Sequence, residues 1–286
     1  MSEKILVIGA NGALGTDLIK VLEHSVPALH ADFDICDRAA AKAFIKKAKV
    51  GTVINTAAFH RVPQCETAWE QAFRVNVMGV RNLAVICGEL GIHLCHISTD
   101  YVFDGKKGAP YTETDPTSPL SIYAISKLAG EQALQAYGRD FSIVRSSGLY
   151  GEIPTRAKGG NFINAMMKLA RERKVVTVVN DEVVSPTYTH DLARAIKALL
   201  ASKGKGIYHI SQQGATSWYE FAQVIFDYLQ LPASLKPISA AEFQTQVQRP
   251  AYSILDNSRF ETQTGFQMPH WNDALLRHLQ QIQAKG

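Results

Sequence analysis

Residues 4–15 read Lys4-Ile5-Leu6-Val7-Ile8-Gly9-Ala10-Asn11-Gly12-Ala13-Leu14-Gly15. A short apolar, β-rich run leads into a turn with glycine at every third position, and residues 14–23 then have helical spacing. Glycines let such a turn close tightly and let backbone N–H groups reach a pyrophosphate at the positive end of the helix. The GxxGxxG spacing is a variant of the common GxGxxG. Its place between a strand and a helix indicates a dinucleotide site.

The same alternation of strand and helix continues through the first half of the chain. Apolar strands separated by helical stretches predict a parallel sheet that is covered on both faces. The expected strands are 4–8, 26–30, 50–56, 92–98 and 141–147, and the expected helices include 14–23, 66–90 and 121–137. The predicted fold class is α/β, a Rossmann-like doubly wound parallel sheet with a smaller mixed C-terminal lobe.

The pattern loosens after residue 150. A loop is expected at 154–160, a helix at 162–173 and a short strand at 175–179, while 185–286 mixes helices with irregular pieces. We predict a dinucleotide-binding domain over 1–150, with later strands from about 175–215 returning to its sheet. The remainder, 151–286, is expected to form a substrate lobe, mainly 151–174 and 216–286. It should lie over the carboxyl ends of the strands, where such sheets bind ligands.

Composition narrows the class of protein. A chain of 286 residues with 46% hydrophobic and 20% charged residues is typical of a globular protein of one large domain, or of one domain and a smaller lobe. The net charge of +4 and the absence of a basic run argue against nucleic acid and fit an anionic small molecule. No apolar stretch reaches the roughly 18 residues of a membrane span, and the first residues lack a signal-peptide pattern. No membrane partner is expected.

Cysteines and histidines give no sign of a metal site. The four cysteines, Cys36, Cys65, Cys87 and Cys95, show neither a CxxC pair nor metal-ligand spacing. They favour reduced thiols in a cytoplasmic protein. The histidines are scattered without an HExxH pair, so no metal is predicted.

A second constellation points to acid–base chemistry. Tyr123 and Lys127 are four residues apart in an expected helix, and Thr99 closes an apolar run upstream. Residues four apart share one helix face, so the ammonium of Lys127 is expected to lower the pKa of Tyr123 from its usual value of about 10. That would suit Tyr123 for proton transfer, with Thr99 binding a carbonyl oxygen. We predict a carbonyl/alcohol oxidoreductase with Thr99, Tyr123 and Lys127 as catalytic residues.

The end of the second strand should discriminate the 2′ position of the cofactor. Residues 28–35 place no acid cleanly at the strand end and contain no Arg, so the expected cofactor is either NAD(H) or NADP(H). His30 could meet a 2′-phosphate or be a surface histidine. Asp34 and Ile35 could border the adenine, or Asp34 could cap the next helix. Residues 55–58 end a buried strand with small side chains, which lets a flat ring or a phosphate approach the backbone.

Several longer segments carry a family resemblance. They read Ser98-Thr99-Asp100-Tyr101-Val102-Phe103-Asp104-Gly105, Ser118-Pro119-Leu120-Ser121-Ile122-Tyr123, Gly160-Asn161-Phe162, Ser185-Pro186-Thr187-Tyr188, Gly206-Ile207-Tyr208-His209-Ile210-Ser211, Ser217-Trp218, Arg249-Pro250-Ala251-Tyr252-Ser253 and Met268-Pro269-His270-Trp271. These segments resemble the extended short-chain dehydrogenase/reductases and, within them, the dTDP-4-dehydrorhamnose reductase family. The resemblance covers essentially the whole chain.

The resemblance implies NAD(P)H-dependent reduction of the 4-keto group of a dTDP-linked 6-deoxyhexose, a nucleotide-sugar substrate. The family's catalytic Thr, Tyr and Lys fall on Thr99, Tyr123 and Lys127. With the turn and strand-end residues above, the predicted cofactor contacts are Gly9, Asn11, Gly12, Ala13, Leu14, Gly15, His30, Asp34, Ile35, Ala57, Ala58, Phe59, Tyr123 and Lys127. The predicted substrate contacts are Thr99, Asp100, Tyr101, Asn161 and Arg249, and Arg249 suits the diphosphate as a bidentate partner.

The chain departs from the family pattern near the expected sugar. Gly148 stands where the family usually has a Trp that helps bind the sugar, and the family's Ala-Tyr-Thr-x-Val-Asp-x-Ala-Glu segment reads Ala58-Phe59-His60-Arg61-Val62-Pro63-Gln64-Cys65-Glu66. These changes leave the exact sugar and base open. The alternatives are another nucleotide-sugar ketoreductase or epimerase of the superfamily, or a non-catalytic cofactor-binding regulatory subunit. The oligomeric state is open as well, and a homodimer is one expectation.

Overall fold

The computed structural model describes residues 4–153, 160–243 and 247–285. Its largest layer is a six-stranded sheet in the order β2-β1-β3-β4-β5-β8, in which every pairing is parallel. The strands are β1 (Ile5–Ile8), β2 (Ser25–Ala28), β3 (Thr52–Asn55), β4 (His93–Thr99), β5 (Phe141–Ser146) and β8 (Gly206–His209). The strand order reverses between β1 and β3, which is where doubly wound sheets open a crevice for ligands. The predicted α/β fold class is confirmed.

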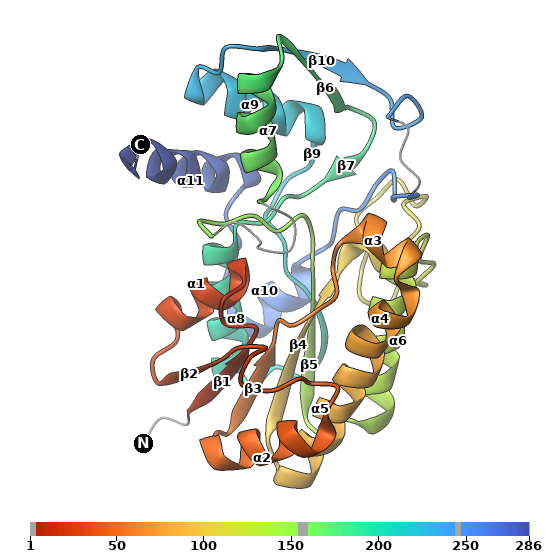
Figure 1. The fold of residues 1–286 in the computed structure, drawn as a ribbon, viewed down its shortest axis with the longest axis vertical. Coiled ribbons are helices and arrows are strands. Elements are labelled where there is room, and N and C mark those ends of the chain that lie inside the picture. Colours follow the sequence, from red (N-terminus) through yellow and green to blue (C-terminus); the bar gives the residue numbers. More distant parts are fainter. Residues whose placement is uncertain (1–3, 154–159, 244–246, 286) are drawn as a thin grey trace.

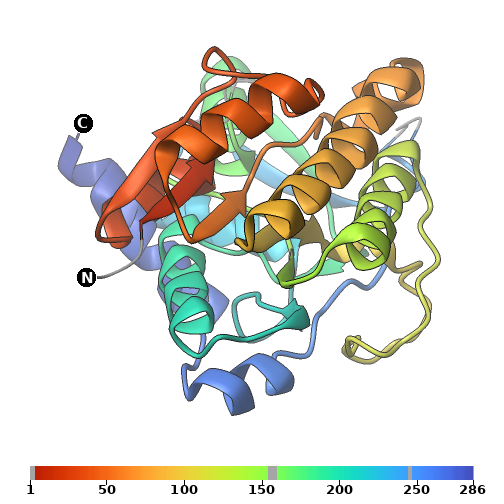
Figure 2. The ribbon, with the colours of Figure 1, turned by 90° about the horizontal axis from the view of Figure 1, so that it is seen from below.

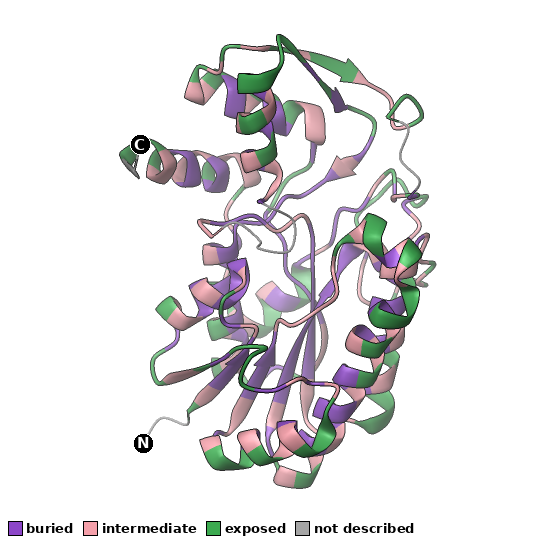
Figure 3. Cartoon of the chain, viewed as in Figure 1, coloured by how far each residue is buried: buried purple, intermediate pink, exposed green. Residues whose placement is uncertain are grey.

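Helices cover both faces of this sheet (Figures 1 and 2). On one face pack α2 (Arg38–Ala48), α5 (Val80–Leu90) and α6 (Ile122–Tyr137). On the other face pack α1 (Ala13–Val21), α8 (Thr189–Ala201) and α10 (Ser258–Thr264). Successive residues of a strand point to opposite faces, so Leu6 and Ile8 of β1 pack in the first layer and Val7 in the second. The strands form the buried centre of this part of the molecule (Figure 3).

The helix expected over 66–90 is divided into shorter pieces. Helix α3 (Val62–Thr67) is followed by α4 (Trp69–Phe73) and by a π-helix, η1 (Arg74–Gly79), that runs into α5. Asn76 is buried in the π-helix, and its side-chain amide both accepts from the N–H and donates to the carbonyl of Phe59. Apolar spacing continues through a π-turn, so the pattern alone does not reveal this interruption.

A second group of elements, here called the upper lobe, lies over the carboxyl ends of the strands (Figure 1). It contains α7 (Phe162–Glu172), α9 (Trp218–Leu229) and α11 (Trp271–Lys285), which share apolar clusters. It also contains a parallel pair of strands, β6 (Val175–Val179) with β10 (Ser234–Ile238), and an antiparallel pair, β7 (Val183–Val184) with β9 (Thr216–Ser217).

The predicted helix 162–173 and strand 175–179 are both present, as α7 and β6. Strand β6 pairs with β10, however, so among the described strands of 175–215 only β8 returns to the six-stranded sheet. Pairing partners depend on contacts between distant segments, which the local pattern does not encode. The loop expected at 154–160 lies outside the described residues apart from Gly160.

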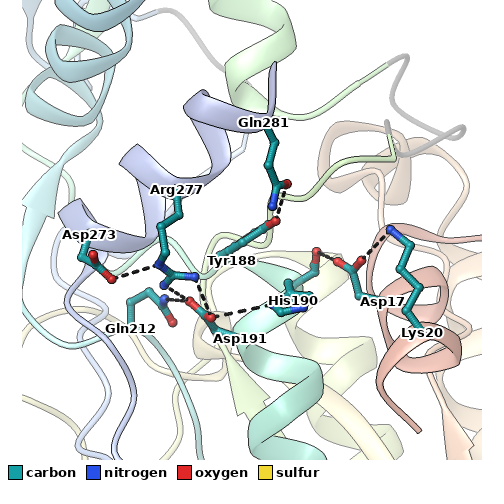
Figure 4. A network of polar contacts seen from close by, with 10 residues as sticks. Asp17, Lys20, Tyr188, His190, Asp191, Gln212, Asp273, Arg277 and Gln281 are labelled. Atoms are coloured by element: carbon teal, nitrogen blue, oxygen red, sulfur yellow. Dashed lines mark hydrogen bonds and ion pairs between the residues drawn. The ribbon is translucent and has the colours of Figure 1, made fainter. Parts of the chain in front are cut away.

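A polar network attaches α11 to the layer beneath it (Figure 4). Arg277 of α11 binds Asp191 of α8 with two contacts of 3.0 and 2.6 Å, and it also binds Asp273 of its own helix at 3.0 Å. The neighbouring Thr189 donates to Asp17 of α1 at 2.6 Å. These two sets of contacts, joined through adjacent residues of α8, link the upper lobe to the helix that follows the glycine turn.

Candidate active site

A cavity of about 1050 Å³ lies between the carboxyl ends of the central strands and the upper lobe. It brings together most of the predicted site residues: Gly9, Asn11, Gly12, Ala13, Leu14, Gly15, Ala57, Ala58, Thr99, Asp100, Tyr101, Tyr123, Lys127, Asn161 and Arg249. The other predicted contacts, His30, Asp34, Ile35 and Phe59, are not among the residues that line it.

The glycine turn forms one end of the cavity. Gly9 has φ 80°, in the left-handed region that favours glycine, and a Cβ there would stand 2.6 Å from the hydroxyl of Thr56. Gly12 begins α1 without a side-chain cap, and Gly12, Ala13 and Leu14 all line the cavity. The first N–H groups of a helix have no partner within it, and they carry its positive end. The turn is therefore suited to an anion such as a pyrophosphate.

The residues after β2 lie outside the cavity. His30 is exposed, and Ile35 is packed in the core beneath the sheet. Asp34 accepts from Arg74 at 3.1 Å, and the next helix, α2, is capped instead by Asp37. Burial acts to raise the pKa of Asp34, but the N–H two residues on and the charge of Arg74 outweigh it and hold the pKa below its usual value. Contact of His30, Asp34 and Ile35 with a cofactor stays a prediction.

The end of β4 provides the floor of the cavity. Thr99 donates to the carboxylate of Asp100 at 2.9 Å and accepts from the N–H of Tyr101 at 3.1 Å, at the start of a short 3-10 helix, η2 (Asp100–Val102). Asp100 is 1% exposed and also accepts from Ser147 at 2.7 Å. Burial raises the pKa of Asp100, although these hydroxyls partly oppose it. Thr99 can offer its proton to another oxygen in the cavity by turning away from Asp100.

Tyr123 reaches the same floor from the start of α6. Its ring stands edge-on to that of Tyr101, with the centroids 6.1 Å apart. The expectation that Lys127 lowers the pKa of Tyr123 is wrong for this structure. Burial is the main cause of a raised pKa, the charge of Asp100 adds to it, and a hydrogen bond with Thr99 opposes it. Tyr123 is therefore a phenol at neutral pH.

Lys127 is held one turn further along α6. It is 2% exposed, donates from Nζ to the carbonyl of Ile97 at 2.7 Å, and lies 3.3 Å from Nε2 of His96. Burial lowers the pKa of Lys127 to about 8, while the charge of Glu131 acts in the opposite direction. The amine is thus close to its titration point near neutral pH, and it borders the cavity beside Tyr123.

Some residues that support the site were missed in the sequence. Glu66 accepts from the N–H of Ile122 at 2.9 Å, and Ser121 caps the same turn, so the two together fix the start of α6 before Tyr123. Asn76 binds Phe59, as described above, and donates to Ser126 of α6 at 2.9 Å. The retained Glu of the family segment was the one available signal for the first contact. No pattern in the sequence indicates that Asn76 contacts Phe59 and Ser126, because the π-helix that places it there is not visible in the residue spacing.

The upper lobe closes the far side of the cavity. Asn161 caps α7 and donates to the carbonyl of Gly151 at 3.0 Å. Gly148 has φ 51°, and a Cβ there would lie 3.3 Å from the indole of Trp218, which itself lines the cavity. Trp218, from the start of α9, thus occupies the space beside the position where the family usually has its own Trp. Arg249 also lines this wall. Burial raises the pKa of the nearby Glu182, and the charge of Arg249 opposes part of that rise.

Across residues 4–153, 160–243 and 247–285 no group of three or more His, Cys, Asp or Glu side chains is placed to hold a metal ion. None of the helices in this part of the chain is long and apolar enough to cross a membrane.

Comparison with known proteins places the chain in a family. The sequence model of the RmlD substrate binding domain matches residues 3–284. A dTDP-4-keto-6-deoxy-D-glucose reductase of Streptomyces niveus is 36% identical over 97% of this chain and 96% of its own. A dTDP-4-dehydrorhamnose reductase of Aggregatibacter actinomycetemcomitans is 35% identical over 95% and 97%. The crystal structure of dTDP-4-dehydrorhamnose reductase from Bacillus anthracis in complex with NADP superposes with a TM-score of 0.93 at 35% identity, covering 98% of this chain and 100% of that one. The chain therefore belongs to the RmlD family, the family of the dTDP-4-dehydrorhamnose reductases.

Proposed function

We propose that this protein uses NAD(P)H to reduce the 4-keto group of a dTDP-linked 6-deoxyhexose, converting dTDP-4-dehydrorhamnose to dTDP-L-rhamnose. The observation that carries the proposal is the meeting of Thr99, Tyr123 and Lys127 in one cavity with the glycine turn at the start of α1. The similarity to named reductases over nearly the full chain supports the same reaction.

The residues present fit a dinucleotide. Gly12, Ala13 and Leu14 present the open end of α1 to its pyrophosphate, and Ala57 and Ala58 leave room beside the backbone for a flat ring. When bound, the nicotinamide supplies the hydride that reduces the carbonyl carbon. The NADP in the Bacillus anthracis structure supports this class of cofactor, and NAD(H) and NADP(H) are both retained as candidates.

Proton delivery is the task of the protein itself. The raised pKa of Tyr123 keeps its proton in place until a more basic oxygen develops beside it. As hydride reaches the carbonyl carbon, the carbonyl oxygen gains negative charge and takes the proton from Tyr123. Thr99 turns its hydroxyl to the same oxygen and stabilises the developing charge. Lys127, which lines the cavity beside Tyr123, would bind the cofactor there.

The upper lobe supplies the substrate side. We propose the division into a cofactor domain and a substrate lobe, with Asn161, Trp218 and Arg249 as the walls that receive the sugar nucleotide. Arg is the side chain best suited to bind a diphosphate with paired contacts. Asp100 and Tyr101, which line the floor beside Thr99, would contact the sugar hydroxyls.

A turnover assay tests the reaction. Purified protein is given dTDP-4-dehydrorhamnose with NADPH or NADH, and consumption of the cofactor and the sugar product are both followed. We expect stoichiometric oxidation of NAD(P)H and formation of dTDP-L-rhamnose. An epimerase would change the sugar without consuming added cofactor and would retain tightly bound NAD after purification. A regulatory subunit would bind cofactor without turnover.

We further propose a homodimer that acts in the cytoplasm. Trp69, Met78, Ile125 and Tyr137 are large apolar side chains that are 53%, 50%, 40% and 50% exposed, and they lie on α4, η1 and α6. These elements run along one side of the molecule (Figure 1), and we propose that these exposed apolar side chains contact the partner subunit. All four cysteines are free thiols, in keeping with a reducing compartment. Light scattering of the parent and of a Trp69→Glu variant tests the dimer, and cell fractionation tests the compartment.

A further inference from the structure

Ser146 ends β5 at the floor of the cavity, and its hydroxyl has no partner. The residue lines the cavity and is 3% exposed, and its Oγ is buried without a hydrogen bond in the described part of the chain. Ser146 is the register partner of Thr99, which ends β4. Neighbouring strands lie about 4.8 Å apart, so the two residues are immediate neighbours. A buried hydroxyl without a partner destabilises the protein, and it calls for an explanation.

The hydroxyls closest to Ser146 in the sequence and across the sheet are already paired. Ser98 donates to Glu131, while Thr99 and Ser147 donate to Asp100 at 2.9 and 2.7 Å. Their partners are therefore supplied by the protein itself. Ser146 is the member of this group whose acceptor has to come from a molecule bound in the cavity.

The order of the strands indicates which molecule reaches Ser146. The glycine turn, which suits a pyrophosphate, follows β1, and the small residues Ala57 and Ala58 follow β3. The adenosine half of a bound dinucleotide lies towards β2, because its 2′ position is discriminated at the end of the second strand. The nicotinamide half therefore extends the other way, past β3 and β4 towards β5, where Ser146 lies.

The chemistry of the nicotinamide ring gives a second argument, which rests on the proposed function. The carboxamide is attached to the ring carbon next to the one that gives up hydride, so it must lie close to the carbonyl that is reduced. Thr99 is the residue proposed to bind that carbonyl, and Ser146 is its neighbour. We propose that Ser146 is a cofactor-binding residue that donates its hydroxyl hydrogen to the oxygen of the nicotinamide carboxamide.

A sugar hydroxyl is the rival acceptor. In the upper wall, Nε1 of Trp218 and Nε of Arg249 are also buried without a hydrogen bond among the described residues. These two donors lie on the side proposed for the sugar nucleotide, whereas Ser146 lies at the end of the sheet beside Thr99. The carboxamide is the polar substituent of the nicotinamide ring, so a bond from Ser146 would fix which face of the ring is turned to the substrate.

A cofactor analogue tests this bond without turnover. In the thionicotinamide analogues of NADH and NADPH a sulfur atom, which accepts hydrogen bonds weakly, replaces the carboxamide oxygen. Full-length protein is titrated with NADH and NADPH, and the one that binds more tightly is compared with its own thio analogue. We expect the analogue to bind roughly 5- to 20-fold more weakly, the loss of one buried hydrogen bond. Equal Kd values would overturn the proposal, whether or not any variant folds.

A pair of serine variants then assigns the difference to Ser146. Ser146→Ala should weaken binding of the natural cofactor by the same factor, and the natural cofactor and its analogue should then bind within about twofold of each other. The control is Ser142→Ala on the same strand. Ser142 is also fully buried, but its Oγ lies 3.1 Å from Nε2 of His93 and it does not line the cavity. This control should keep the full preference of the parent for oxygen over sulfur.

The possible outcomes are distinct. If Ser146→Ala keeps the preference of the parent, another group binds the carboxamide and the proposal is overturned. If Ser146→Ala binds cofactor normally but dTDP-L-rhamnose more weakly, the hydroxyl belongs to the sugar and the proposal is overturned as well. A parent that binds neither NADH nor NADPH would refute the proposed function together with this inference. A parent that shows the expected preference but does not reduce the sugar would contradict the proposed reaction alone.

Discussion

The buried ion pair beneath the catalytic helix offers a sharp test of what stabilises the site. Glu131 and Arg145 have side chains that are 0% and 3% exposed, and Arg145 donates to Glu131 at 2.7, 3.0 and 3.2 Å. Ser98 donates to the same carboxylate. Glu131→Gln removes the negative charge and leaves the guanidinium buried without a counter-charge. Breaking a buried pair from one side costs roughly 3–5 kcal/mol, and because Gln keeps one acceptor we expect about 3 kcal/mol.

Thermal unfolding measures this loss. For a chain of this size about 3 kcal/mol corresponds to a fall in Tm of roughly 6–12 °C. The matched control is Glu89→Gln, which makes the same chemical change in the pair that Glu89 forms with Arg38, where the side chains are 36% and 49% exposed. Exposed pairs contribute little, so the Tm of the control should stay close to that of the parent. Equal falls in Tm for Glu131→Gln and Glu89→Gln would refute the reasoning.

Three further changes have defined outcomes. Arg277→Met leaves the carboxylate of Asp191 buried without its main partner. Because Arg277 is itself 34% exposed, we expect the free energy of unfolding to fall by less than in Glu131→Gln, about 2 kcal/mol, with a lower Tm. An unchanged Tm would contradict this. Burial and the charge of Arg145 lower the pKa of His209 to about 3. As the pH falls below about 6.5, this histidine therefore takes up a proton in the unfolded chain but not in the folded one. The free energy of unfolding of the parent should fall by about 2 kcal/mol by about pH 5. His209→Gln should flatten that part of the Tm–pH profile, and an equally steep profile would count against it. Arg249→Lys should raise KM for the sugar nucleotide without changing the Kd of NADPH, because Lys cannot make paired contacts to a diphosphate. The control is Arg171→Lys, at an exposed position on α7. If Arg249→Lys changes neither constant, Arg249 does not belong to the substrate site.

Much of the fold could be predicted because its signals are local. The glycine turn, the apolar strands and the helix that carries Tyr123 and Lys127 each appear in a short stretch of sequence, and the structure has all of them. The interruption of the helix at η1 and the pairing of β6 with β10 could not be predicted in this way. They depend on contacts across the chain, such as the binding of Asn76 to Phe59.

In the site, too, local spacing could be predicted from the sequence and contacts between distant segments could not. Spacing on a helix placed Tyr123 and Lys127 in one volume, but the environment that sets their pKa values comes from other elements. Burial and the charge of Asp100 raise the pKa of Tyr123. The amine of Lys127 donates to the carbonyl of Ile97 and lies beside the ring of His96. An expectation based on that pair alone therefore gave the wrong direction for the pKa of Tyr123.

The turnover of Tyr123→Phe tests the central claim most directly. The kcat of the parent and of the variant would be measured with dTDP-4-dehydrorhamnose and saturating NADPH, together with the Kd of NADPH for each protein. Only the proton donor is removed, so kcat should fall by roughly 10²- to 10⁴-fold while the Kd of NADPH stays unchanged. A kcat within a few-fold of the parent would contradict the assignment of Tyr123 as the proton donor.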